Sequence, residues 1–269
     1  MIKMGRKKRA GQFVSALATA IVAAMASAGA ANCPRPGTLG TSRILHVDAV
    51  TTPQVGLKSF PQTLPLRDHE VVLTFDDGPW PPTTPRVLAA LSGQCVRATF
   101  FLIGKQASEH PELVRRIAAE GHTIGHHTWT HRSLMQIPAE ETTEEIDRGI
   151  SANEMALHGV ATTTPSTPFF RFPGFETTPA TLELLQSRGI VVFGTDLWAG
   201  DWNKMTPAHE LKLITDRLKT AGKGIILFHD PKARTAVMLP AFLRYLRDNH
   251  YRVVHLVPAG AGVDFDGVP

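Results

Sequence analysis

Short apolar runs alternate along the chain with segments whose apolar residues recur every three or four positions. The runs are typical of buried β-strands, and the periodic segments are typical of amphipathic helices. Parallel neighbouring strands need crossovers of this length, so the alternation predicts a mostly parallel sheet in an α/β fold, either open and doubly wound or closed into a barrel. The expected strands are residues 71–75, 98–103, 122–125, 169–172, 190–195, 224–228 and 252–256, and the expected helices are residues 84–91, 112–120, 139–157, 179–187, 207–219 and 235–249.

The pattern predicts one main domain, because no low-complexity tract or long linker interrupts it. We place this domain at residues 70–269. Residues 31–69 are rich in Pro, Gly, Thr and Ser and contain one strand-like run at 43–47, so they are expected to form an extended lead-in.

Residues 1–30 have the anatomy of an export signal. A basic start precedes an alanine-rich apolar run over residues 13–28, and the small residues Ala28-Gly29-Ala30 predict cleavage near Ala30. The alternative is a membrane anchor, but the run is shorter than the ~20 apolar residues that a spanning helix needs. We therefore expect a periplasmic or secreted protein without stable membrane insertion after cleavage.

The net charge of +4 belongs to this leader. Five of the 28 lysines and arginines fall within the first nine residues, so the remaining 23 face 24 acidic residues. A nearly neutral body argues against a nucleic-acid partner. The two cysteines, Cys33 and Cys95, could form one disulfide or remain free, and the sequence leaves this open, as it does the oligomeric state.

Ionisable residues follow five of the expected strands. They are Asp76 and Asp77, His126 and His127, Arg171, Asp196 and Asp201, and His229 and Asp230. Because the carboxyl ends of parallel strands share one edge of a sheet or one rim of a barrel, these side chains are expected to meet in an active site.

The spacing of two histidines in this set indicates a metal site. His127 and His131 are four residues apart, so both rings could face one ion, and Asp76 or Asp77 could add a carboxylate. Two histidines and one acid leave coordination positions open, which is typical of catalytic rather than structural sites. The same ligand set occurs in iron-dependent oxygenases, but a second acid beside it favours hydrolysis.

The remaining groups suggest an acid and a base. One of the adjacent aspartates can bind the ion while the other accepts a proton from water, and the residues alone do not say which. Arg171 is the candidate partner that would hold the base by paired hydrogen bonds. His229 is the candidate general acid, and Asp196 or Asp201 would favour its protonated ring.

The motifs that contain these residues resemble, in order, those of the polysaccharide deacetylase family, the NodB-homology carbohydrate esterases of family 4. They are Thr74-Phe75-Asp76-Asp77-Gly78-Pro79, His127-Thr128-Trp129-Thr130-His131, Arg171-Phe172-Pro173, Asp201-Trp202 and Leu227-Phe228-His229, and Ala98-Thr99-Phe100-Phe101 is similar to the second strand of the family. The resemblance spans about residues 71–255. It implies a distorted (β/α) barrel of about seven parallel strands.

The resemblance also implies a hydrolase that removes N-acetyl or O-acetyl groups from a glycan with a divalent metal, most commonly Zn²⁺, with Co²⁺, Ni²⁺ and Mn²⁺ as alternatives. By the family pattern, Asp76 is the base, the metal ligands are Asp77, His127 and His131, Arg171 orients the base, His229 is the acid, and Pro173, Gly174, Trp202 and Leu227 contact substrate. The expected substrate is N-acetylglucosamine in chitin-like oligosaccharides or peptidoglycan. The alternatives are an O-acetyl xylan esterase and a carbohydrate-binding protein without turnover.

The chain departs from the family pattern at two positions. Gly174 precedes Phe175, whereas the family usually has the aromatic residue first. Trp198 stands where the family usually has an acid three residues before the Asp-Trp pair, so Asp196 or Asp201 is expected to take over that function.

Overall fold

The computed structural model describes residues 1–2, 33 and 35–260, so nearly all of the expected leader and its cleavage point lie outside the described residues. The strands are β1 (Thr41–Val47), β2 (Gln54–Val55), β3 (Glu70–Asp76), β4 (Thr99–Leu102), β5 (Thr123–His126), β6 (Phe169–Phe170), β7 (Val191–Phe193), β8 (Leu197–Trp198), β9 (Gly224–His229) and β10 (Arg252–Pro258). The helices are α1 (Thr84–Gly93), α2 (Gly104–Glu109), α3 (Pro111–Ala119), α4 (Ala139–His158), α5 (Pro179–Ser187), α6 (Pro207–Ala221) and α7 (Ala233–Asp248), with short 3₁₀ turns at Leu134–Gln136 and Pro173–Phe175.

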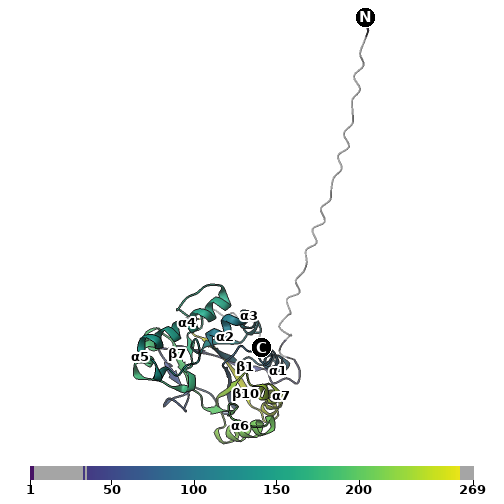
Figure 1. Ribbon diagram of the computed structural model, residues 1–269. Helices are drawn as coiled ribbons and strands as arrows, with labels where there is room; N and C mark the ends of the chain where they lie inside the picture. The colour runs from purple at the N-terminus through teal and green to yellow at the C-terminus, as the bar shows by residue number, and fades with distance from the viewer. Residues whose placement is uncertain (3–32, 34, 261–269) are drawn as a thin grey trace.

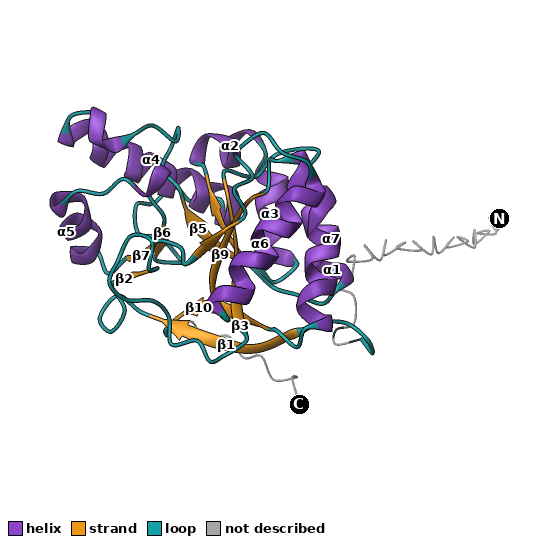
Figure 2. Cartoon of the chain, turned by 90° about the horizontal axis from the view of Figure 1, so that it is seen from below, coloured by secondary structure: helices purple, strands orange, loops and turns teal. Residues whose placement is uncertain are grey.

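The strands form a distorted (β/α) barrel, as the resemblance implied. Every strand pair in the described residues is parallel, which confirms the expected sheet. Strand β3 lies at the centre between β9 and β4, and its first residues also pair with β10. Helices surround the strands on the outside (Figures 1 and 2). Within residues 35–260, no helix has the length and apolar character needed to cross a membrane.

Strand β3 is buried on both faces, and its side chains point alternately outward to the helices and inward to the barrel. Leu73 and Phe75 pack outward in the cluster that includes the apolar sides of α1 and α7. Val72 packs in the smaller cluster formed mainly by the strands themselves. Asp76 lies two alternations beyond Val72, so the same period places its carboxylate inside the barrel rim.

The described part of the expected lead-in, residues 33 and 35–69, contributes to this sheet and its core. Strand β1 pairs with β10 and strand β2 pairs with β7. Val47, Val55, Leu64 and Leu66 are buried in the strand-lined cluster. The segment therefore belongs structurally with the barrel that follows it.

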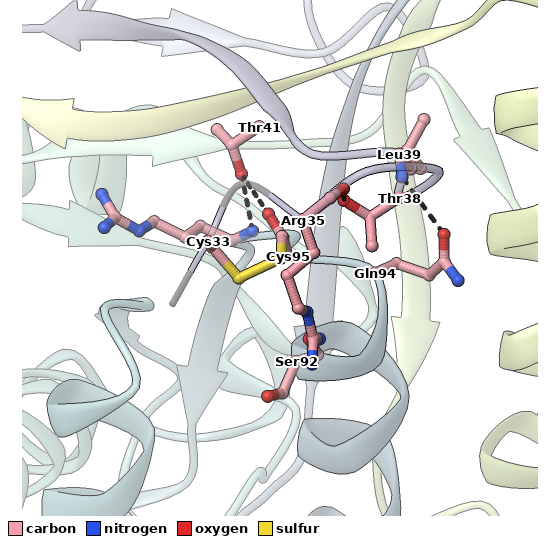
Figure 3. Close-up of a disulfide and its surroundings, with 9 residues drawn as sticks. Cys33, Arg35, Thr38, Leu39, Thr41, Ser92, Gln94 and Cys95 are labelled. Carbon is pink, nitrogen blue, oxygen red and sulfur yellow. Dashed lines mark hydrogen bonds between the residues drawn. A yellow bond between two sulfur atoms is a disulfide. The ribbon is translucent and has the colours of Figure 1, made fainter. Parts of the chain in front are cut away.

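A disulfide joins Cys33 to Cys95, which answers the question that the sequence left open. It closes a loop of 62 residues in sequence separation and fastens the start of the described chain beside the turn that leads into β4. Figure 3 shows the neighbouring contacts: the Thr41 hydroxyl donates to the Cys95 carbonyl at 3.4 Å, and the Leu39 N–H donates to the Gln94 side chain at 3.2 Å.

Candidate active site

The register of the parallel strands brings the candidate residues to one end of the barrel. Asp76 closes β3 and is the direct partner of His229, which closes β9. Strand β5 ends at His126, so His127 and the loop after it begin at the same rim. The carboxyl ends of β3, its neighbour β9 and β5, which is separated from β3 by β4, therefore supply the acids and imidazoles at one rim, as expected for a barrel of this kind.

Asp77, His127 and His131 form a group whose ligand atoms all lie within 4.8 Å of one another. Asp77 Oδ1 lies 3.5 Å from His127 Nε2 and 3.3 Å from His131 Nε2. Although it is buried, this oxygen has no hydrogen-bond partner. Asp77 has a φ of 76°, a left-handed conformation that turns the chain after β3 and keeps its side chain at the same pocket as Asp76.

The ring of His127 is fixed by a backbone contact. Its Nδ1 lies 2.6 Å from the carbonyl oxygen of Arg171. Because a carbonyl can only accept, Nδ1 carries the proton and Nε2 presents its lone pair toward Asp77. His131 is placed by a different route: its backbone N–H donates to the Thr128 hydroxyl at 3.1 Å in the turn between the two histidines.

Asp76 is held by Arg171, whose side chain is fully buried inside the barrel. The guanidinium donates to Asp76 Oδ1 at 2.7 Å and to the Thr74 hydroxyl at 2.9 Å. It also donates to the carbonyls of Phe193 and Gly194, at 3.2 and 2.8 Å. A buried guanidinium held by four hydrogen bonds is a rigid support, so Asp76 has a fixed orientation, and its other oxygen lies 3.9 Å from His127 Nε2.

On the other side of the pocket, His229 pairs with Asp201. Asp201 is fully buried and accepts from His229 Nδ1 at 2.7 Å through Oδ1 and from the His229 backbone N–H at 2.7 Å through Oδ2. This leaves His229 Nε2 toward the pocket, 4.0 Å from Asp77 Oδ2. Because Asp201 accepts from Nδ1, the pair favours the protonated ring of His229 at the edge of the pocket.

This arrangement lowers the pKa of some titrating groups and raises the pKa of others. Burial would raise the pKa of Asp77, but the surrounding imidazoles, that of His127 foremost, hold it well below its usual range. Burial and the neighbouring His127 lower the pKa of His131. Burial would also lower the pKa of His229, but its hydrogen bond to Asp201 and the charge of that carboxylate prevail and raise it to about 9.

One pocket of about 460 Å³ is lined by Asp76, Asp77, His127, His131 and His229. Of the residues expected to contact substrate, Gly174, Trp202 and Leu227 line it; Pro173 is not among the lining residues but begins the 3₁₀ turn that carries Gly174. Sequence reasoning missed Phe172, Phe175 and Lys232, which also line it. Lys232 follows His229 by three residues and could have been found by scanning the loop after β9.

The third motif is unusual in its backbone as well as its order. Gly174 and Phe175 both have a φ of 60°, in the left-handed region that favours glycine. The usual family order would place glycine at position 175, so here an aromatic residue takes this conformation at the pocket wall.

Asp196 does not reach His229, which corrects the expectation that it could serve the acid. Its carboxylate accepts from the N–H groups of Leu57 and Ile225 and from the Thr63 hydroxyl, at 2.7–2.8 Å. The reason is the two-residue strand β8, which begins at Leu197 beside Ile226 and so leaves Asp196 at the amino end of a strand. Trp198 is likewise engaged elsewhere, beneath Lys58 Nζ at 4.3 Å and Arg217 at 4.5 Å.

The fold and the site together define a class: a (β/α) barrel with an acid–base pocket at the carboxyl ends of its strands. Comparison with known proteins gives the family. The sequence profile named Polysaccharide deacetylase matches residues 64–193. The family 4 carbohydrate esterase from Streptomyces lividans, solved with acetate, is 30% identical with a TM-score of 0.58, over 70% of this chain and 91% of that one. The chain therefore belongs to the polysaccharide deacetylase family.

Two further relatives are similar in part. The peptidoglycan deacetylase structure of Bdellovibrio bacteriovorus has a TM-score of 0.73 at 29% identity, over 86% of this chain and 62% of that one. A peptidoglycan-N-acetylglucosamine deacetylase of Bacillus cereus is 46% identical over 82 residues, 30% of each protein. The chain spans between 30% and 40% of the length of the curated relatives that it matches, some of them named chitooligosaccharide deacetylases.

Proposed function

We propose that this protein is a metal-dependent hydrolase that removes acetyl groups from N-acetylglucosamine residues of a glycan, either peptidoglycan or a chitin-like oligosaccharide. Family membership supports deacetylation, and the printed names of the relatives support these two substrates. The observation that carries the proposal is the triangle of Asp77, His127 and His131 beside an arginine-held second carboxylate, Asp76.

The triangle fits a divalent cation such as zinc. Ligand atoms that bind Zn²⁺ tetrahedrally at about 2.0–2.1 Å lie roughly 3.3 Å apart. The distances of 3.3 and 3.5 Å from Asp77 Oδ1 to the two Nε2 atoms agree with this, and that oxygen is buried without a hydrogen-bond partner. The depressed pKa of Asp77 and the lowered pKa of His131 favour the unprotonated forms that bind a metal.

A cation bound there would polarise the acetyl carbonyl and make a nearby water easier to deprotonate. Asp76 is then the general base. It lies next to the triangle, and Arg171 holds its Oδ1 so that Oδ2 is left for the water proton. Fixing the base in advance removes the entropic cost of orienting it during the reaction.

His229 is the general acid in this proposal. Departure of the amine needs a proton, and the imidazolium stabilised by Asp201 holds one at neutral pH on the nitrogen that faces the pocket. Leu227 and Trp202 line the pocket and would contact the acetyl methyl, while a backbone N–H in the Pro173–Phe175 turn would donate to the developing oxyanion.

We also propose that residues 1–30 direct export and are removed, and that residues 31–69 and 70–269 then work as one unit outside the cytoplasm. The Cys33–Cys95 disulfide supports an oxidising compartment. Sequencing the amino terminus of protein recovered from the periplasm or medium tests the expected start near Ala31.

Acetate release from N-acetylated chitin oligosaccharides, peptidoglycan and acetylated xylan tests the activity. We expect release from at least one of the first two, loss with a chelator, and recovery with Zn²⁺. Release from xylan alone would identify the O-acetyl esterase instead. Binding of a glycan without acetate release, by protein shown to contain metal, would contradict the enzyme proposal, and Asp76→Asn serves as the inactive control.

A further inference from the structure

A second buried carboxyl group, Glu210, lies behind the Asp201–His229 pair. Glu210 is in the first turn of α6, which Thr206 caps by accepting the His209 N–H at 3.2 Å. Helix α6 packs against α7, and the Glu210 side chain is fully buried in that contact. The Thr235 hydroxyl on α7 lies 2.8 Å from Asp201 Oδ2 and 3.1 Å from Glu210 Oε1.

Counting protons across these contacts fixes the state of Glu210. A threonine hydroxyl has one hydrogen and can donate to only one of the two carboxyl groups. Asp201 already accepts two hydrogen bonds from His229 and makes the shorter contact to Thr235, so the hydroxyl donates to Asp201. With that hydrogen engaged by Asp201, the contact at 3.1 Å is a full hydrogen bond only if Glu210 Oε1 carries a proton and donates it to the Thr235 oxygen.

We propose that Glu210 is a neutral carboxylic acid that positions the acid side of the active site through the relay Glu210–Thr235–Asp201–His229. The proposal rests on the deacetylase function given above. Glu210 touches neither substrate nor His229; it fixes the direction of the Thr235 hydroxyl, and the hydroxyl in turn supports the ionised Asp201. Linked hydrogen bonds of this kind strengthen one another in a dry interior.

The groups around Glu210 agree with this state. Burial and the negative charge of Asp201 raise the pKa of Glu210 to about 7, against smaller opposing effects from Thr235, Arg234 and His229. The amino end of α6 favours a negative charge in its first turn and so acts in the opposite direction. The other carboxyl oxygen, Oε2, has no hydrogen-bond partner, and a buried carboxylate would be poorly stabilised with one oxygen bare.

The protonation state can be observed directly. Protein labelled with ¹³C at glutamate carboxyl groups is compared with Glu210→Gln at pH 6 by infrared or NMR spectroscopy. We expect the substitution to remove the signal of a neutral carboxyl group. The matched control is Glu70→Gln. Glu70 is similarly buried, but its ion pair with Arg43 keeps it ionised, so this substitution should remove a carboxylate signal instead. Loss of a carboxylate signal in Glu210→Gln would overturn the proposal.

The positioning function is tested by two variants of similar size. Glu210→Gln can donate its amide N–H to Thr235, so we expect nearly wild-type kcat. Glu210→Leu cannot donate, and we expect kcat to fall about three- to tenfold, the effect of one hydrogen bond, with KM unchanged. Equal kcat in all three proteins, or equal loss in both variants, would contradict the relay.

A readout without turnover separates this inference from the proposed function. The proton resonance of His229 Nδ1–H should move in Glu210→Leu and stay in place in Glu210→Gln. An unmoved resonance in Glu210→Leu would reject the relay whether or not the enzyme is active. Absence of acetate release from wild-type protein together with the expected shifts would reject only the deacetylase function.

Discussion

Asp76 and Asp77 are adjacent in the chain, yet their carboxylates have different partners. Asp76 accepts from Arg171, whereas Asp77 Oδ1 faces two imidazoles. We therefore expect Asp76→Asn to keep bound metal while kcat falls by about 10²–10⁴, the usual contribution of a general base. Asp77→Asn should lose the metal as well. Metal content by mass spectrometry and acetate release distinguish the two, and loss of metal in Asp76→Asn would contradict this division.

The sequence could place these aspartates at one rim but could not separate them. The residues alone left open which aspartate would bind the ion; in the structure both line the same pocket, because Asp77 leaves the strand with a φ of 76°. A positive φ at a non-glycine residue leaves no sequence signal. Arg171 and His229 were found because each follows an apolar strand, and Glu210 was missed because an acid in the first turn of a helix is common.

Among the helices, α4 approaches the histidine loop unusually closely at Gly149. A Cβ atom at this position would lie 2.4 Å from the Thr128 carbonyl carbon. Gly149→Ala must therefore push α4 away from the loop between His127 and His131, and we expect about 1–3 kcal/mol lower stability and weaker metal retention. The control is Gly93→Ala at the end of α1, where no atom lies within 4 Å. Urea unfolding and metal content are the measurements; equal behaviour of both variants would refute the packing argument.

An ion pair between partly exposed Arg43 on β1 and buried Glu70 on β3 should make the stability depend on pH. Glu70 accepts from Arg43 at 2.7 and 2.9 Å, and this contact lowers the pKa of Glu70 to about 2, against burial that would raise it. The folded state thus binds fewer protons than the unfolded chain between pH 4.5 and 2. The stabilisation is complete above pH 4.5 and disappears as the pH falls toward 2.

Glu70→Gln should therefore be less stable than wild type at pH 7. The difference in stability between the two proteins, referred to below as the gap, should narrow steadily below pH 4.5. Thermal unfolding across this range measures the gap. Glu109→Gln, at an exposed position on α2, is the control and should show little difference at any pH. A gap that widens in acid would show that the ion pair is not the cause.

Secondary structure was predictable where local signals are strong. Helix α5 has the bounds expected from sequence, because Thr178 caps it and Pro179 begins it. Helix α2 was missed because six residues are too few to show a periodic apolar face. Strand β8 was missed for the same reason, and this short element accounts for the misplacement of Asp196.

At the scale of the whole molecule, the disulfide acts mainly on the unfolded chain. Closing a loop of 62 residues should contribute about 4 kcal/mol. We expect the free energy of unfolding of Cys33→Ser/Cys95→Ser to fall by about this amount. The variant should keep its metal, because the disulfide lies before the amino end of β4, whereas the site lies at the carboxyl ends of the strands. Denaturant unfolding with and without reductant tests this. Reductant should affect wild type and leave the double variant unchanged.

The parallel architecture followed from the alternation of strands and helices, but two features of the assembly did not. The pairing of β3 with β9 and β10 depends on contacts between residues more than 150 positions apart, such as Val71 with Gly224. The inclusion of β1 and β2 in the sheet depends on partners far along the chain, β10 for β1 and β7 for β2. Local patterns carry no information about such distant choices.

The proposed base and acid end two strands that share an unbroken ladder of six residue pairs, from Val71 and Gly224 to Asp76 and His229. Both strands are almost wholly buried at the middle of the fold, so Asp76 and His229 cannot drift apart unless the sheet itself opens. The activity and the cooperative unfolding of the protein should therefore depend on the same pairing of β3 with β9. On slow heating, turnover should persist until the fold as a whole gives way, with no inactive yet folded species between them.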